Sequence, residues 1–265
     1  MSLPLLKRNI SAIVKVLFTF FCIVTIYTVV IIYMYDPKLS DMLNDYQLAL
    51  PEMMKAVGMS GIATNLLEFI RIYLYGFIMM IFPMVVSIIA VNRTIVQHVD
   101  SGSMATILAT PNSRMRILFT NWISIVCSVT LLIAAVTGVG IVFSEMQFPG
   151  ELDTKQYWVL NGVMILVHLA LASMIFLAGC IFNDAKKYYF FGAGVPVIFF
   201  LFQLLSNMGG KLENLKYFTI FTLFPAEKIT AGEGDIMINV VALLAITVIC
   251  SVLGFIVFKK KDLPL

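Results

Sequence analysis

Charged residues are scarce in this sequence. Asp, Glu, Lys and Arg make up 12% of its 265 residues, whereas 60% are apolar and the mean hydropathy is +0.97. A soluble globular domain carries about 25% charged residues. The shortage of charge therefore excludes an ordinary soluble fold. The net charge of +3 is small, and the sequence gives no reason to expect a nucleic-acid partner.

Cysteines and nucleotide-binding motifs are sparse as well. Each of the four cysteines lies alone in a different apolar run, so we predict neither a disulfide framework nor a metal site. These cysteines are Cys22, Cys127, Cys180 and Cys250. The sequence has no GxxxxGK[ST] phosphate loop, so the chain is not expected to hydrolyse ATP. It also has no TVGYG-type filter, no Arg ladder and no cluster of catalytic residues.

Long apolar runs dominate the sequence instead. Their length and lack of charge predict an all-α integral membrane protein whose single transmembrane domain fills residues 1–265. The six predicted spans cover about residues 16–35, 69–91, 117–143, 158–182, 188–207 and 236–258. Pro83 is expected to kink the second span. Small residues in the third span, including Gly138 and Gly140, should allow another helix to approach closely.

Lys and Arg are divided unevenly between the two predicted sides of the membrane. One side has eleven of the eighteen Lys and Arg residues but only three of the fifteen Asp and Glu residues. Lys and Arg concentrate on the cytoplasmic side of membrane proteins. The basic side includes both chain termini and the loop from Arg93 to Arg116, so we expect these three segments to be cytoplasmic.

The loop from Arg93 to Arg116 contains the most informative local pattern. Ser103 is a candidate N-cap for a short helix of about residues 101–110, and Pro111 would end that helix. Its apolar positions recur at i, i+3 and i+4: Met104, Ile107 and Leu108. A helix of two turns is not stable alone in water. Its apolar face must lie on the ends of the protein's own helices or in a groove of a soluble partner.

Two further segments are apolar without being predicted spans. Residues 3–15 place aliphatic side chains on one helical face and lysines on another, which predicts an interfacial helix along the inner leaflet. The run from Tyr217 to Phe224 is too short to cross a bilayer and too apolar for water. We therefore predict a re-entrant or interfacial hairpin within about residues 207–235, broken at Pro225.

Three ionisable residues are candidates for a substrate path. Glu68 and Arg71 lie at i and i+3 at the outer mouth of the second span, where either a helix-end ion pair or contact with a moving substrate explains them. His168 lies near the middle of the fourth span. An ionisable group there is a functional hypothesis, and a neutral histidine bonded to a neighbouring helix is the alternative.

Three stretches resemble the permease subunits of type-2 ATP-binding-cassette (ABC) exporters: LPEMMKAVGM (50–59), FPMVVSIIAVNRTIVQHVDSGSMATILATPNSRMRIL (82–118) and FKKKDLPL (258–265). In that family, a cytoplasmic coupling helix follows the second span. The resemblance implies that residues in and beside this helix dock on an ATPase: Asp100, Ser101, Gly102, Ser103, Met104, Ile107, Leu108, Pro111 and Arg114. The chain departs from the family by having only one acidic residue before the glycine, and by having Asn121 at a commonly basic position.

The resemblance also implies partners and a task. Two ABC ATPase subunits would hold the ATP and Mg²⁺. In a bacterial plasma membrane, the permease would pair with a second copy of itself, as a homodimer, or with a related subunit. The subunit contact and translocation path are expected to involve the first and fifth spans, through Phe18, Phe21, Ile26, Gly192 and Gly194. The cargo would be amphipathic peptides, as in exporters of phenol-soluble modulins or of antimicrobial peptides, or other hydrophobic molecules. An ATP-independent channel or carrier is the alternative function.

Overall fold

The computed structural model describes residues 2–35, 54–55, 58–59, 61, 63–109, 112–232 and 234–261. The described residues form helices and no strands, which confirms the predicted all-α class. Among the described residues, six helical stretches are long and apolar enough to cross a membrane. They are α1 (Leu3–Tyr33), α5 with η2 and α6 (Ile78–Val91, Asn92–Val96 and Gln97–Asp100), α8 (Arg114–Gln147), α9 (Thr154–Ile181), α10 with η3 and α11 (Ala185–Tyr188, Tyr189–Ala193 and Gly194–Asn207), and α13 (Met237–Lys260).

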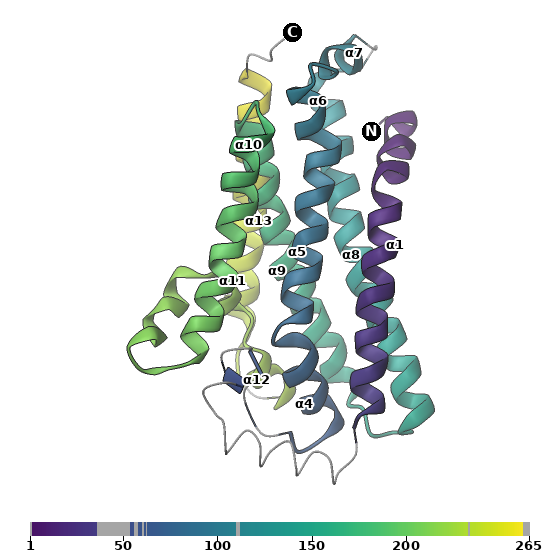
Figure 1. Ribbon diagram of the computed structural model, residues 1–265, viewed down its shortest axis with the longest axis vertical. Helices are drawn as coiled ribbons and strands as arrows, with labels where there is room; N and C mark the ends of the chain where they lie inside the picture. The colour runs from purple at the N-terminus through teal and green to yellow at the C-terminus, as the bar shows by residue number, and fades with distance from the viewer. Residues whose placement is uncertain are drawn as a thin grey trace.

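Shorter elements lie at the two ends of this bundle. They are α4 (Leu66–Ile70), η1 (Arg71–Tyr75), α7 (Met104–Leu108), η4 (Gly210–Phe218), η5 (Ile220–Leu223) and α12 (Ala226–Thr230). Both ends of the described chain lie at the same end of the molecule as α6, α7 and α10 (Figure 1). We call this end the terminal face. The end that carries α4 and α12 is the opposite face.

The helices form two rough layers, with α5 and α9 at the centre. In Figure 1, α1, α5 and α11 lie in front, and α8, α9 and α13 lie behind them. About two-thirds of the residues in the most apolar part of the α5–α6 stretch and of α9 are buried (67% in each). The corresponding share is 22% in α1, 22% in the α10–α11 stretch and 17% in α13. The outer helices therefore expose apolar surface that only lipid or another subunit can cover.

Pro83 interrupts the hydrogen-bond ladder inside α5. Proline has no N–H, so the carbonyl of Met79 loses the partner it has in a regular helix. His168 of α9 replaces that partner, with its Nε2 2.8 Å from the Met79 carbonyl oxygen. The side chain of His168 is completely buried. His168 thus supplies the hydrogen bond that Pro83 removes from α5. This is the second explanation that the sequence left open, a neutral histidine bonded to a neighbouring helix.

The prediction of a separate interfacial helix over residues 3–15 is wrong. Helix α1 runs without a break from Leu3 to Tyr33, because its only proline, Pro4, lies in the first turn and it contains no glycine. Asn9 fastens the start of α1 to α8, since its Nδ2 donates to Asn121 Oδ1 at 2.8 Å and to Ser124 Oγ at 3.2 Å. These bonds hold the first turns of α1 upright in the bundle.

The second span lies farther toward the terminal face than the sequence predicted. The helix continues past Arg93 to Asp100, whereas the predicted span ended at residue 91 and the predicted loop began at residue 93. Arg93 is accommodated because its Nη1 donates to the carbonyl of Ala12 at 2.6 Å. The π-helical turn η2 is stabilised by Asn121, which donates to the Thr94 carbonyl at 3.0 Å.

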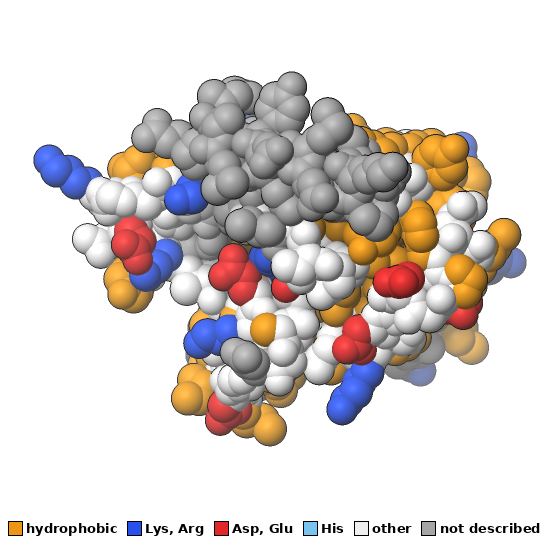
Figure 2. Space-filling model, turned by 90° about the horizontal axis from the view of Figure 1, so that it is seen from below, with side chains coloured by type: hydrophobic (Ala, Val, Ile, Leu, Met, Phe, Trp, Pro, Cys, Tyr) orange, Lys and Arg blue, Asp and Glu red, His pale blue; other side chains and the backbone are white. Residues whose placement is uncertain are grey.

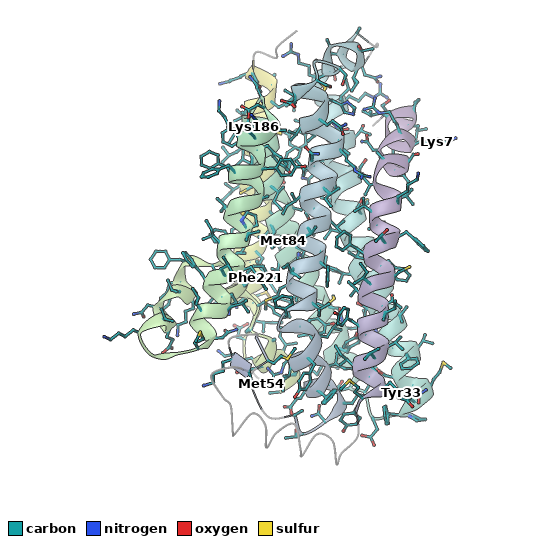
Figure 3. All side chains as sticks on the ribbon, viewed as in Figure 1. Lys7, Tyr33, Met54, Met84, Lys186 and Phe221 are labelled. Carbon is teal, nitrogen blue, oxygen red and sulfur yellow. The ribbon has the colours of Figure 1, made fainter. Side chains whose placement is uncertain are left out.

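The segment between α11 and α13 turns back along the bundle and does not form a span. It consists of the two 3-10 helices η4 and η5 followed by α12. Phe221 is buried, whereas Tyr217 and Phe218 expose 73% and 66% of their surface. In Figure 3, Phe221 lies between the level of Met84, near the middle, and that of Met54 at the opposite face. This course is compatible with a re-entrant segment, and its depth in the bilayer stays a prediction.

Gly140 confirms the predicted close approach of a neighbouring helix. A Cβ at Gly140 would lie 2.3 Å from the hydroxyl oxygen of Tyr157 on α9. At Gly138, by contrast, an added Cβ would meet no atom within 4 Å. The aromatic ring of Tyr157 is fully buried, so Gly140 provides the space in which α8 and α9 pack together.

Candidate functional site

A short helix, α7, lies at the terminal face where the sequence predicted a helix of about residues 101–110. It follows the α6 helix through a turn in which Gly102 has a positive φ of 71°, a conformation that glycine adopts without strain. Pro111 and Thr110 lie outside the described residues. Ser113 caps the following helix, since its hydroxyl accepts a hydrogen bond from the N–H of Arg116 at 3.2 Å.

The apolar face of α7 packs, at least in part, on the protein's own helices. Met104 is only 2% exposed, while Ile107 and Leu108 are half-buried against the core. Thr106 and Ala109 are exposed. The surface of α7 that is open to a partner therefore centres on Thr106 and Ala109, with only the outer parts of Ile107 and Leu108.

Ser103 precedes α7 but does not cap it. Its side chain makes no capping hydrogen bond, which corrects the predicted N-cap role. The hydroxyl oxygen of Ser103 instead lies 2.9 Å from Nδ1 of His98 and 2.9 Å from the hydroxyl of Ser101. The other ring nitrogen of His98 lies 2.8 Å from a guanidinium nitrogen of Arg8. The turn before α7 is thus tied to α1.

Two more predicted residues tie this region to distant parts of the chain. Asp100 accepts a hydrogen bond from the backbone N–H of Ala185 at 3.3 Å, which joins α6 to α10. Arg114 donates to the carbonyl of Lys261 at 3.1 Å. The ammonium group of Lys261 in turn donates to the carbonyls of Cys180 and Phe182 at 2.9 and 2.7 Å. These contacts connect the start of α8, the end of α9 and the end of α13.

Lys261 has an unusual environment just beyond the last span. Burial against the end of α9 lowers the pKa of its ammonium group to about 8. The two carbonyl acceptors offset only part of the cost of removing the charge from water. Lys261 is therefore a titratable group at the point where three helices meet.

At the opposite face, the structure separates Glu68 from Arg71. Glu68 accepts hydrogen bonds from the N–H and hydroxyl of Thr64, at 2.9 and 2.6 Å, and its own N–H donates to Asn65 Oδ1. This arrangement caps α4. Arg71 forms its ion pair with Glu227 of α12, at 3.4 Å. The ion pair between Glu68 and Arg71, one of the two explanations that the sequence left open, is not formed among the described residues.

Acidic and basic side chains are interspersed across the opposite face, with hydrophobic side chains toward its edge (Figure 2). Arg71 lines a pocket there with residues from α11, η4, η5 and α12. Glu68, which was predicted beside Arg71 on a substrate path, serves as a helix cap. His168 does not line this pocket and is buried in the interior of the bundle. The three predicted path residues therefore occupy three different environments.

Several residues that organise the terminal face were not predicted as site residues. Arg8, His98, Asn9 and Lys261 each bridge helices that are far apart in the sequence. The available signal was their polar character at the edges of apolar runs. Spacing alone does not identify partners that are so distant along the chain. No group of three or more His, Cys, Asp and Glu side chains within the described ranges is arranged to hold a metal ion.

The fold and the terminal face define a multi-pass α-helical membrane protein with a short helix between its second and third spans. The chain belongs to the ABC-2 family transporter proteins, whose family pattern it matches over residues 5–263. It is therefore a membrane subunit of an ABC transporter, and transporters of this class also contain ATPase subunits. No curated protein matches the chain.

Proposed function

We propose that this chain is the permease of an ATP-driven exporter and that α7 is its coupling helix. The observation that carries the proposal is the dual character of α7: Met104 is anchored in the permease, while Thr106 and Ala109 face outward. A helix held on one side and open on the other is suited to enter a partner's groove. In this proposal the terminal face and both termini are cytoplasmic, and the membrane is a bacterial plasma membrane.

The contacts of the terminal face provide a route for the motion. Hydrogen bonds join the turn around α7 to α1 through His98 and Arg8, and to α10 through Asp100 and Ala185. Closure of two ATPase subunits around ATP and Mg²⁺ would push α7, and these contacts would pass the shift to the spans as a rigid-body movement. Arg114 and Lys261 would carry the same shift to α9 and α13.

We also propose that two copies of the permease pair in the membrane. The outer surface of α1 remains apolar, with Phe18 65% and Ile26 63% exposed, and α11 exposes apolar residues as well. Gly192 does not belong to that contact as predicted, because it is buried against the ring of Tyr188, 2.8 Å from the position of an added Cβ. The partner surface is therefore formed by the exposed side chains of α1 and α11.

The cargo proposed for this exporter is an amphipathic peptide or another hydrophobic molecule. The apolar outer surfaces and the pocket at the opposite face suit molecules with both apolar and polar parts. The alternative function is an ATP-independent channel or carrier. Proteoliposomes decide between them: peptide export should require both the ATPase and ATP. Equal flux through the permease alone would favour the channel or carrier.

Docking is tested by placing a carboxylate on the exposed side of α7. Thr106→Glu should weaken ATPase association about 100-fold, because a buried unpaired charge in an apolar groove costs several kcal/mol. Leu108→Asp should weaken it at least as much, and also disturb the half-buried side of α7. Lys259→Glu, which changes an exposed residue of α13 on the same face, is the matched control and should leave association unchanged. Membrane level and ATPase binding are measured for all three.

A further inference from the structure

A pocket of about 480 Å³ lies at the opposite face, beside the break between η1 and α5. Three of its lining residues are basic and two carry side-chain amides. They are Arg71, Lys216, Lys228, Gln203 and Asn207. Ile72, Met80 and Phe224 supply apolar parts of the wall. The pocket therefore combines positive charge, amide groups and apolar surface in one hollow.

Arg71 brings unused hydrogen-bond donors to this pocket. Its side chain is 10% exposed, and its Nε has no hydrogen-bond partner among the described residues. Its contact with Glu227 is 3.4 Å long, and the side chain of Glu227 is 72% exposed to water. Such an ion pair is weak. A buried donor without a partner is costly, so the guanidinium is prepared to bind an oxygen ligand.

Gln203 brings an unused acceptor to the same pocket. Its amide nitrogen donates to Asn207 Oδ1 at 3.0 Å, which orients the amide group. Its carbonyl oxygen, Oε1, is buried and has no hydrogen-bond partner among the described residues. A ligand that satisfies both Arg71 and Gln203 must therefore offer an oxygen acceptor and an N–H or O–H donor.

Two further features favour an anionic oxygen. Helix α5 begins at Ile78, next to the pocket residues Gly76 and Met80, so the positive end of its dipole lies at the pocket. Lys216 already forms an ion pair with Glu213, in which Nζ lies 2.6 Å from Oε1. Lys228 forms no ion pair with any described residue. The pocket lining also contains Glu227, so its three basic residues and one acidic residue leave it with a net positive charge.

We propose that this pocket binds the C-terminal residue of a peptide cargo through its carboxylate. A peptide's last residue carries a carboxylate and an amide N–H on one Cα, which match Arg71 and Gln203. Its side chain would meet the apolar wall. A phosphatidylcholine headgroup has no N–H or O–H donor and leaves Gln203 without a partner. This inference rests on the proposed peptide cargo and adds the group by which the cargo is recognised at the exit side.

The experiment compares two forms of one probe. A fluorescent 20-residue amphipathic Leu/Lys peptide is made with a free C-terminal carboxylate and with a C-terminal amide. Binding of each form to the full chain in phosphatidylcholine nanodiscs is measured. The carboxylate form should bind about 10-fold more tightly or better, since a charge-assisted hydrogen bond is lost in the amide. Arg71→Gln should reduce its affinity to that of the amide form.

Two variants separate recognition from folding. Lys228→Gln removes one exposed cation from the pocket and should reduce the preference for the carboxylate form about 3-fold, even if Arg71→Gln fails to fold. Lys211→Gln changes an exposed lysine of η4 that does not line the pocket, and should leave the preference intact. Native size-exclusion behaviour is required of each variant that is compared.

The outcomes separate carboxylate recognition from peptide cargo. Equal binding of the two peptide forms would overturn carboxylate recognition while leaving peptide cargo in place. Absence of binding by either form would contradict the peptide cargo itself, and with it this inference. Nanodiscs containing phosphatidylglycerol provide the last arm. If that anionic lipid abolished the difference between the two peptides, the pocket would be a lipid site and the proposal would be wrong.

Discussion

At the scale of single residues, His168 and Pro83 act as a pair. The Nε2 of His168 bonds to the Met79 carbonyl that Pro83 leaves without its usual N–H donor. This explains an ionisable side chain in the middle of a membrane bundle without assigning it to the cargo path. The same arrangement gives a specific expectation for stability.

Replacing His168 should destabilise the protein only while Pro83 is present. We expect His168→Leu to cost about 1 kcal/mol, because the Met79 carbonyl loses its partner in an apolar surrounding. In a Pro83→Ala background the cost of His168→Leu should fall to about a few tenths of a kcal/mol. The alanine that replaces Pro83 can donate its own N–H to the Met79 carbonyl. Unfolding in detergent measures the four stabilities, with His168→Gln as the variant that can still donate. The same cost in both backgrounds would contradict the pairing.

Lys261 gives a second expectation, on pH. Its pKa in the folded protein is about 8, whereas an ordinary lysine has a pKa of about 10.4. Its charged form therefore disfavours the folded state. That cost is fully present below pH 8 and is relieved as the pH rises from about 8 toward 10.4. Acylation of Lys261, followed by peptide mass spectrometry, should reach half its maximal rate near pH 8 in the native protein.

The denatured protein provides the control for this measurement. In denaturant, Lys261 should titrate like an ordinary lysine, because the carbonyls of Cys180 and Phe182 no longer bury it. An identical pH profile in the two states would show that the ammonium group is not desolvated at the end of α9.

At the scale of elements, Gly140 sets the distance between α8 and α9. Gly140→Ala places a methyl group 2.3 Å from the Tyr157 hydroxyl and should destabilise the protein by about 1–3 kcal/mol. Gly138→Ala, on the same helix, meets open space and should be neutral or slightly stabilising. Tyr157→Phe should restore part of the loss in the Gly140→Ala protein. Equal effects of the two glycine substitutions would argue against this packing.

The segment that contains η4 gives an expectation for membrane depth. Tyr217 is 73% exposed in the chain, so we expect lipid to cover its ring. A fluorophore on Tyr217→Cys should be quenched by nitroxide lipids of the outer leaflet. The matched control is Glu151→Cys, in the turn between α8 and α9, which should react with water-soluble reagents from the outside. Reaction of Tyr217→Cys with an impermeant reagent from the terminal face would contradict the re-entrant interpretation.

The sequence predicted elements better than it predicted their ends and contacts. Hydropathy identified the stretches that became α8, α9 and α13, because a span needs about twenty apolar residues wherever it lies. It ended the second span at residue 91, since it cannot register that Arg93 bonds to the Ala12 carbonyl of α1. The prediction of an interfacial helix was wrong because hydropathy also cannot register the hydrogen bonds of Asn9, whose partners come from α8 in the folded bundle.

The position of the short helix α7 was predictable in outline, because it depends on local spacing in the sequence. The i, i+3, i+4 pattern located α7 within a few residues. It did not reveal which side faces outward, because Met104 packs on the protein's own core. The roles of Glu68 and Arg71 depend on Thr64 and Glu227, and only three-dimensional contacts assign them.

At the scale of the whole molecule, the protein is a helical bundle. We propose a different function for each of its two ends. The terminal face presents α7 and fastens it to α1 and α10 through His98 and Asp100. The opposite face contains the pocket lined by Arg71 and Gln203. Between them, α5 and α9 form the buried centre along which a shift at one end would reach the other.

The most direct test of the coupling role of α7 is where the ATPase touches the permease. A photoreactive amino acid is placed at Thr106 on the exposed side of α7, and at Tyr217 on the far side of the molecule, in cells that also express the cognate ATPase. Thr106 should crosslink to the ATPase and Tyr217 should not. An intact complex in which Thr106 forms no crosslink to the ATPase, or in which Tyr217 does, would contradict the central claim.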